Sequence, residues 1–207
     1  MKPKINAGDR SQIQWADGNW VFIDIGFSSK GRTCGLLFGN GSPTNVQFAD
    51  ARGMITDRVK ESKSIVNLVI EAPLSVCFDS SGNPKGRRIE KEGDKYRYWY
   101  TGPGCAVMVA AMYLIRDIHE AKTGVPVRLF EGFISYKHGT VMSDHKTDVS
   151  VLREVVRDPI KFSDSIYDVD ALKSDPSDLL SSAFCVAGLD CGIPAVIKPN
   201  LSPHESV

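Results

Sequence analysis

The sequence lacks several features that would place it in a specialised class of protein. Its 207 residues carry no formal net charge, whereas a dedicated duplex-binding protein usually shows a basic excess. No apolar run reaches the roughly 20 residues that a membrane-spanning helix needs, and no secretory signal is visible before Trp20. We therefore expect no membrane span, and any contact with nucleic acid must come from a local patch of the surface.

Cysteine and histidine motifs are missing as well. The five cysteines are odd in number and form no CxxC pair. This argues against a disulfide framework or a zinc ribbon and favours the reducing cytoplasm as the location. The histidines follow none of the common metal-binding spacings, such as HExxH. His145, just before a predicted helix, is therefore expected to be a surface residue, with contact to a substrate as the alternative.

What is present is an alternation of strand and helix patterns. Apolar runs bounded by turn signals predict strands at residues 20–26, 33–38, 45–48, 65–70, 127–132 and 193–197. Helical spacing of apolar residues predicts helices at about residues 50–62, 105–122, 148–157 and 179–187. A three-strand meander followed by strand–helix units predicts an α/β fold, in which a mixed sheet carries helices on both faces.

The length fits one domain with a peripheral insertion. We expect an N-terminal tail at residues 1–19, a single domain at 20–198 and a C-terminal tail at 199–207. Residues 72–103 are rich in turn residues and predict a long loop within the domain, and such a loop is usually functional or disordered.

Two acidic residues stand at the ends of predicted buried strands. Asp24 follows the apolar run Val21–Ile23, where an acid must be paired, hydrogen-bonded or metal-bound. Capping of nearby turn amides is the alternative. Glu71 ends the next strand after the first helix, and the carboxyl ends of parallel strands meet at the ligand-binding edge of an α/β sheet. The pair predicts a functional site in which Asp24 and Glu71 bind metal and take part in catalysis.

Three further acids lie near the ends of predicted elements. Asp175 and Asp178 stand three residues apart at the start of a predicted helix, where they can cap the helix and can also reach the sheet edge. Glu131 ends another predicted strand and is a further candidate ligand; the alternatives are a supporting contact to the ligands or an ion pair with Arg128 or Arg116. Carboxylates that converge without His or Cys favour Mg²⁺ or Mn²⁺ over zinc. Two such ions roughly 4 Å apart can drive phosphodiester hydrolysis.

Residues 85–100 mix cations with aromatic rings. The basic residues of this segment include Arg87 and Arg88, and four aromatic side chains follow them. Such a segment can contact phosphates and stack on bases, which makes it a candidate nucleic-acid contact. The alternative is a solvated loop whose rings pack on the domain or on the second subunit of a homodimer. Arg87, Arg88 and Lys30 are the predicted substrate-binding residues.

Four short motifs carry a resemblance through their order and spacing. They are Phe22–Gly26, Val69–Ser75, Leu129–Gly132 and Asp175–Ala183, and together they span about residues 20–198. The pattern resembles the ribonuclease-H-like superfamily, which includes Holliday-junction resolvases. It is most similar to the predicted-nuclease family called domain of unknown function 429.

The resemblance implies a ribonuclease-H-like fold and a set of metal ligands. In that superfamily an Asp of the first strand, a later strand-end carboxylate and an Asp of the last helix bind metal. By resemblance these roles fall on Asp24, Glu71 and Asp178, with Asp175 as a fourth ligand and Glu131 as a further candidate.

Three functions are compatible with these patterns. The first is a nuclease that depends on Mg²⁺ or Mn²⁺. The second is a nucleotide-binding phosphotransferase-like protein of the same fold, because Asp24–Lys30 resembles the first phosphate loop of the actin and sugar-kinase proteins. Its drawback is that those proteins need a duplicated domain, which 207 residues cannot hold. The third is a catalytically silent binding module whose acids are structural.

Overall fold

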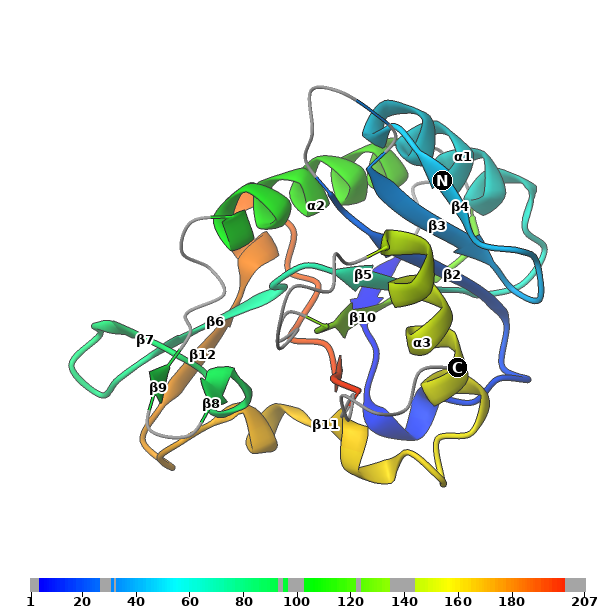
Figure 1. The fold of residues 1–207 in the computed structure, drawn as a ribbon. Helices are drawn as coiled ribbons and strands as arrows, with labels where there is room; N and C mark the ends of the chain where they lie inside the picture. The colour runs from blue at the N-terminus through cyan, green and yellow to red at the C-terminus, as the bar shows by residue number, and fades with distance from the viewer. Residues whose placement is uncertain are drawn as a thin grey trace.

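A mixed β-sheet runs through the centre of the protein (Figure 1). The computed structural model describes residues 4–26, 31, 33–92, 95–96, 103–121, 124–134 and 144–199. The described strands of the sheet are β1 (Ile5–Ala7), β2 (Asn19–Asp24), β3 (Cys34–Phe38), β4 (Thr44–Val46), β5 (Val66–Glu71), β10 (Val127–Gly132), β11 (Ile166–Tyr167) and β13 (Val196–Ile197). Their order is β4-β3-β2-β5-β10-β13-β11, and β1 also pairs with β10.

The direction of the strands divides this sheet into two parts. β2, β3 and β4 form an antiparallel meander, as the turn signals predicted. β2, β5 and β10 are parallel neighbours. Parallel strands need a crossover connection, and helices α1 (Phe48–Glu61) and α2 (Pro103–Glu120) lie in these connections. An α/β fold with a mixed sheet is therefore confirmed.

Helices cover both faces of the sheet (Figure 1). On β2, Val21 and Ile23 belong to the core that α1 and α2 complete. Trp20 and Phe22 point the opposite way and pack in the core of α3 (His145–Arg157), because successive residues of a strand face opposite sides. Both faces of β2 and β5 are thus buried, which explains their nearly continuous apolar sequences.

A smaller three-stranded sheet lies to one side, at the left of Figure 1. Its strands are β6 (Ser75–Phe78), β7 (Pro84–Lys85) and β12 (Leu179–Ser182), in the order β12-β6-β7. A separate hairpin pairs β8 (Lys91–Glu92) with β9 (Lys95–Tyr96). Short 3-10 turns complete the described chain: η1 (Arg10–Gln12), η2 (Arg88–Glu90), η3 (Ser163–Ser165), η4 (Val169–Leu172) and η5 (Ala183–Ala187).

The predicted helix at residues 179–187 is wrong. Leu179–Ser182 is strand β12, which pairs with β6, and only Ala183–Ala187 winds into a 3-10 turn. Leu179, the first residue of the expected apolar stripe, is 57% exposed, whereas Ala183 and Phe184 are buried, so only the second half of the stripe packs in the core. The free edge of β6 offers backbone hydrogen bonds to this segment, and this tertiary pairing overrides a weak helical pattern.

Two segments are more ordered than the sequence predicted. The loop expected at residues 72–103 contains β6, β7, β8 and β9 within its described part. The tail expected before Trp20 contributes β1, which pairs with β10, and Ile13, which is buried in the core beside α3. Short strands of two to four residues are difficult to predict because their pairing partners lie far away in the chain.

None of the described helices is long and apolar enough to span a membrane.

Candidate metal centre

The carboxyl ends of β2 and β5 place two carboxylates side by side. Asp24 and Glu71 are direct neighbours in the parallel register of these strands. Both lie on the α3 side of the sheet, because Phe22 and Val69, two residues earlier, pack in the α3 core. The structure thus brings Asp24 and Glu71 together at the predicted edge, while their roles in catalysis stay a prediction.

Helix α3 adds a histidine and a third carboxylate to this edge. Asp144 caps the helix by accepting a hydrogen bond from the backbone N–H of Lys146, so that His145 and Asp148 lie in its first turn. Residues three apart share one face of a helix. Nδ1 of His145 lies 2.7 Å from Oδ2 of Asp24. Asp24, His145 and Asp148 each offer a ligand atom within 4.8 Å of the other two, so the group could bind a metal ion.

Two glycines allow the start of α3 to lie this close to the sheet. A Cβ atom on Gly26 would stand 2.6 Å from Nε2 of His145, and one on Gly35 would stand 2.5 Å from the carbonyl carbon of His145. Real Cβ atoms essentially never show contacts below 3.0 Å. A side chain at either glycine would therefore force His145 away from Asp24.

The site concentrates negative charge. Asp24 and Asp148 are only 2% and 4% exposed. Burial raises the pKa of Glu71 well above its ordinary value, and the charge of Asp24, a hydrogen bond with Asp24 and the charge of Asp148 raise this pKa further. The backbone N–H of Ile134 donates to Oε1 of Glu71 at 3.3 Å and opposes the shift. A carboxyl group that keeps its proton beside two other acids indicates a site that favours a cation.

The raised pKa of Glu71 predicts a specific dependence of stability on pH. The folded protein holds this proton to a higher pH than the unfolded chain, whose glutamates titrate near 4.5. The free energy of unfolding of metal-free protein therefore falls as pH rises from about 4.5 through the folded-state pKa. Glu71→Gln copies the protonated form and removes this contribution.

Thermal unfolding in the presence of a chelator measures the effect. We expect Glu71→Gln to unfold at a higher temperature than wild type at pH 8, with the difference shrinking as pH falls towards 5. A constant difference across this range would show that Glu71 does not titrate with a raised pKa.

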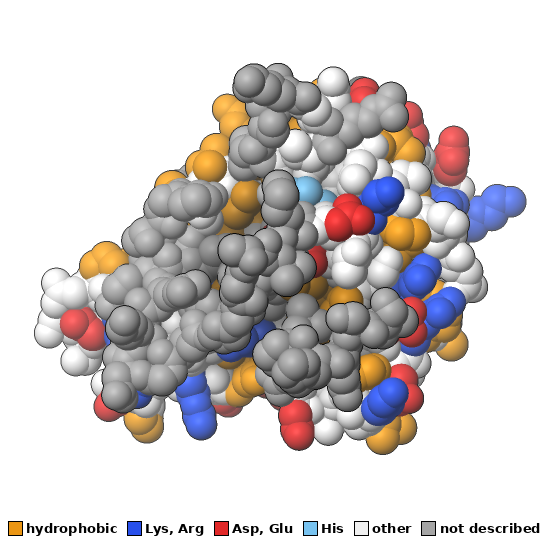
Figure 2. Space-filling model, viewed as in Figure 1, with side chains coloured by type: hydrophobic (Ala, Val, Ile, Leu, Met, Phe, Trp, Pro, Cys, Tyr) orange, Lys and Arg blue, Asp and Glu red, His pale blue; other side chains and the backbone are white. Residues whose placement is uncertain are grey.

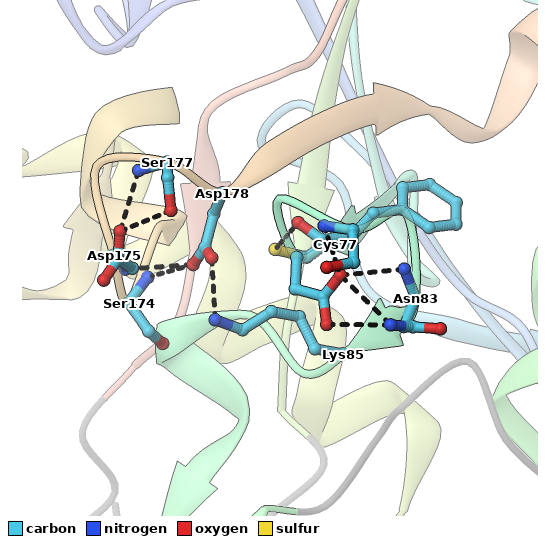
Figure 3. A network of polar contacts seen from close by, with 10 residues as sticks. Cys77, Asn83, Lys85, Ser174, Asp175, Ser177 and Asp178 are labelled. Carbon is cyan, nitrogen blue, oxygen red and sulfur yellow. Dashed lines mark hydrogen bonds and ion pairs between the residues drawn. The ribbon is translucent and has the colours of Figure 1, made fainter.

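Asp178 lies in the smaller sheet, just before β12, where its contacts are structural (Figure 3). Its side chain is 1% exposed, and its Oδ1 lies 2.7 Å from Nζ of Lys85. Its Oδ2 accepts hydrogen bonds of 2.9 Å from the backbone N–H groups of Ser174 and Asp175. The bond from Lys85 and these amide bonds hold the pKa of Asp178 below its usual range. The predicted metal binding by Asp178 gains no support from this arrangement.

Asp175 closes a turn in the same region. Its Oδ1 accepts hydrogen bonds from the backbone N–H and the hydroxyl of Ser177, at 2.8 and 2.6 Å (Figure 3). The hydroxyl bond and then the N–H bond lower the pKa of Asp175. The sequence predicted that Asp175 could cap a helix, but strand β12 follows instead, and Asp175 closes a turn.

Glu131 and Arg87 form a buried ion pair instead of contacting a substrate. Both side chains are 0% exposed. The guanidinium donates two hydrogen bonds of 2.8 Å to the Glu131 carboxylate and further bonds to Glu90 and to Ser75 Oγ. Full burial leaves Arg87 no surface with which to meet nucleic acid. The predicted substrate binding by Arg87 therefore gains no support from this arrangement, and Glu131 is the partner of Arg87 and not of Arg128 or Arg116.

Arg88 and Lys30 are the other residues predicted to bind substrate. Arg88 is exposed at the start of η2. Lys30 lies outside the described residues. Of the segment 85–100, the structure describes residues 85–92, 95 and 96. Nucleic-acid binding by this segment stays a prediction.

The sequence reasoning missed His145 and Asp148. The predicted helix began at Asp148, and the search for histidine motifs tested spacings with two histidines. One signal was present: Asp148 stands one residue before Val149 and four before Leu152, both fully buried, and so belongs to the buried face of an amphipathic helix. An acid on such a face, three residues after a histidine, indicates a candidate ligand pair.

The surface near the site carries mixed charges. Figure 2 shows a histidine side chain beside acidic and basic side chains on the face seen in Figure 1.

Comparison of the chain with protein-family models, with curated proteins and with solved structures finds no match in any of the three. The assignment of a metal-binding group to this site therefore rests on the geometry of Asp24, His145 and Asp148 in a mixed α/β fold.

Proposed function

We propose that this protein is a divalent-metal-dependent phosphodiester hydrolase, a nuclease, of the ribonuclease-H-like type. The observation that carries the proposal is the group of ligand atoms from Asp24, His145 and Asp148, all within 4.8 Å of one another. Glu71, hydrogen-bonded to Asp24, adds a third carboxyl group beside them. Such clusters at the carboxyl edge of an α/β sheet are typical of catalytic sites.

The topology supports the ribonuclease-H-like type. An antiparallel meander of β2, β3 and β4 continues into the parallel strands β5 and β10, with helices on both faces. The superfamily places its metal ligands on the first strand, on a later strand end and on a helix. Asp24 and Glu71 occupy the two strand positions, and Asp148 of α3 is the helix acid that joins them, in place of Asp178.

The donor set changes the metal that we propose. Carboxylates alone favour Mg²⁺ or Mn²⁺, but His145 adds an imidazole nitrogen, which Mg²⁺ rarely accepts. Mn²⁺ accepts both carboxylate oxygen and imidazole nitrogen. We therefore propose Mn²⁺ as the preferred ion, with Mg²⁺ binding more weakly.

The residues at the site have two proposed roles, metal binding and orientation of a ligand. Asp24, His145 and Asp148 would hold the ion, and Glu71 orients the Asp24 carboxylate through their hydrogen bond. A bound divalent ion supplies Lewis-acid polarisation of a phosphoryl oxygen and lowers the pKa of bound water. Exposed Arg88 and the rest of the segment 85–100 are proposed to contact the nucleic-acid backbone.

A cleavage assay with defined substrates tests this function. We expect purified protein with Mn²⁺ to cleave at least one of single-stranded DNA, duplex DNA, RNA or a four-way DNA junction. Asp148→Asn should reduce the rate at least about 100-fold, because the site loses one anionic ligand. Thermal unfolding of the variant controls for folding.

Three results would contradict the proposal. They are no cleavage of any of these substrates with any divalent ion, cleavage that a chelator does not stop, and an Asp148→Asn variant with wild-type activity. Nucleotide hydrolysis without cleavage of nucleic acid would instead favour the phosphotransferase-like alternative.

A further inference from the structure

The hairpin formed by β3 and β4 contacts the start of α3. Nδ2 of Asn45, on β4, lies 3.5 Å from Oδ1 of Asp144, the residue that caps α3. His145, the next residue, lies against Asp24. The hairpin therefore contacts the helix one residue from a proposed metal ligand.

The same hairpin contacts the other end of α3. Nη1 of Arg153 donates to the backbone carbonyl of Gly41 at 3.0 Å, and Nη2 of Arg157 donates to Oδ1 of Asn40 at 2.5 Å. Asn40 and Gly41 form the turn between β3 and β4. Polar contacts with one hairpin thus hold both ends of the helix that carries His145 and Asp148.

The sheet register places Asn45 in line with the metal-binding acids. Asp24 pairs with Gly35 across the β2–β3 ladder, and Gly35 pairs with Asn45 across the β3–β4 ladder. Because paired residues point to the same face of a sheet, Asn45 and Asp24 share the α3 side. Gly35 between them leaves room for the backbone of His145. The start of α3 is therefore held between Asp24 and Asn45.

Apolar packing alone does not set the position of this helix. The buried residues of α3 apart from Asp148 are Val149, Leu152, Val155 and Val156, and apolar contact is non-directional. The side chain of His145 is 31% exposed, so its surroundings hold it on one side only. Directional polar contacts at the helix ends are needed to fix His145 to within the tolerance of a metal site.

We propose that Asn45 is a positioning residue of the metal centre, which fixes His145 through its contact with the α3 cap Asp144. This inference rests on the proposed metal-dependent function. The Nδ2 group of Asn45 donates to Asp144, whereas its Oδ1 is buried and has no hydrogen-bond partner among the described residues. A buried polar atom without a partner is unusual and calls for an explanation. The unsatisfied Oδ1 adds nothing to the stability of β4, so we assign the role of this side chain to its contact with α3.

Mn²⁺ titration by calorimetry tests the proposal at a temperature well below unfolding. Asn45→Ala should weaken Mn²⁺ binding by about 10-fold to 100-fold, as is typical for groups that orient metal ligands. The exchange variant N45D/D144N swaps donor and acceptor and keeps a good helix cap, so it should restore most of the lost affinity. Gln47→Ala is the matched control, because Gln47 is exposed and makes no side-chain capping bond at the start of α1.

The outcomes separate this proposal from the proposed function. If wild type binds Mn²⁺ and Asn45→Ala binds it equally well, the positioning role is refuted while the metal centre stands. The same holds if N45D/D144N binds as weakly as Asn45→Ala, because the contact between the two side chains then does not matter. If wild type binds neither Mn²⁺ nor Zn²⁺, the metal centre itself is refuted, and the positioning role with it.

Discussion

Replacing Glu131 by alanine is expected to lower the free energy of unfolding by about 3–5 kcal/mol. The Glu131 carboxylate accepts two hydrogen bonds from Arg87 and one of 2.8 Å from the backbone N–H of Leu74, all in a fully buried environment. Alanine would leave the guanidinium without its main counter-charge. A buried cation that loses its partner is among the most destabilising changes a protein can undergo.

Loss of the Glu131 carboxylate would also affect the candidate metal site. Leu74 follows Glu71 by three residues, and Ser75, the next residue, contacts Nη1 of Arg87 at 2.9 Å. The ion pair therefore holds the segment that leads from β5 into the smaller sheet. Without it, we expect the position of Glu71 to become less defined, which hydrogen exchange at the amides after β5 would detect.

Urea denaturation with two comparison variants tests this prediction. Glu90→Gln is the first, because burial raises the pKa of Glu90 and the nearby Glu131 charge adds to this rise, so a neutral side chain there should cost less. The triple variant R87M/E90Q/E131L is the second, since apolar side chains in place of a buried ion pair are often tolerated better than a single unpaired charge, and Gln leaves no unpaired carboxylate at position 90. If Glu131→Ala unfolds at the same urea concentration as wild type, the pair does not stabilise the fold.

Replacing Asp24 by asparagine is expected to abolish measurable binding of Mn²⁺ and, with it, cleavage of nucleic acid. Asp24 contacts His145 at 2.7 Å, shares a hydrogen bond with Glu71 and belongs to the group that could bind a metal. Asp24 therefore contacts both His145 and Glu71 and shares the ligand group with Asp148. No other single change should reduce metal affinity as much.

The effect on stability has opposite signs with and without metal. In the metal-free protein, Asp24→Asn removes one charge from a crowded acidic site, so we expect an unchanged or higher unfolding temperature. With wild type, an ion at 100 times its dissociation constant adds about 2.7 kcal/mol, or roughly 5–10 °C for a domain of this size. Asp24→Asn should lose this metal-induced increase.

Asp178→Asn provides the matched control. Asp178 is buried like Asp24 but binds Lys85 and the amides of Ser174 and Asp175 in the smaller sheet (Figure 3). We expect this variant to keep the metal-induced increase in unfolding temperature even if its metal-free stability falls. Loss of the increase in both Asp178→Asn and Asp24→Asn would favour the ligand set predicted from the sequence, because that set contains both residues.

The sequence was informative where local pattern and tertiary environment agree. β2 and β5 are buried on both faces, so their apolar runs are continuous and their limits are clear. Asp24 and Glu71 end these strands, and parallel pairing alone was enough to predict that they meet. The helices α1 and α2 follow from the spacing of their buried residues for the same reason.

The sequence was misleading where distant pairing decides the local structure. The segment after Asp178 has a weak helical pattern, but the edge of β6 draws it into a strand. Arg87 stands among exposed-looking cations, yet Glu131, 44 residues away in the chain, draws it into the interior together with the nearby Glu90. Neither the pairing with β6 nor the ion pair with Glu131 has a signature in the neighbouring residues.

The sequence by itself therefore determined the α/β class and the strand-end carboxylates Asp24 and Glu71, because these depend on burial patterns that each strand carries alone. Only the tertiary structure decided which helix completes the site. Asp178 and Asp148 are both acids at the start of a predicted helix, and nothing local distinguishes them. The packing of α3 against Gly26 and Gly35 brings His145 and Asp148 to Asp24, whereas Asp178 meets Lys85 in the smaller sheet.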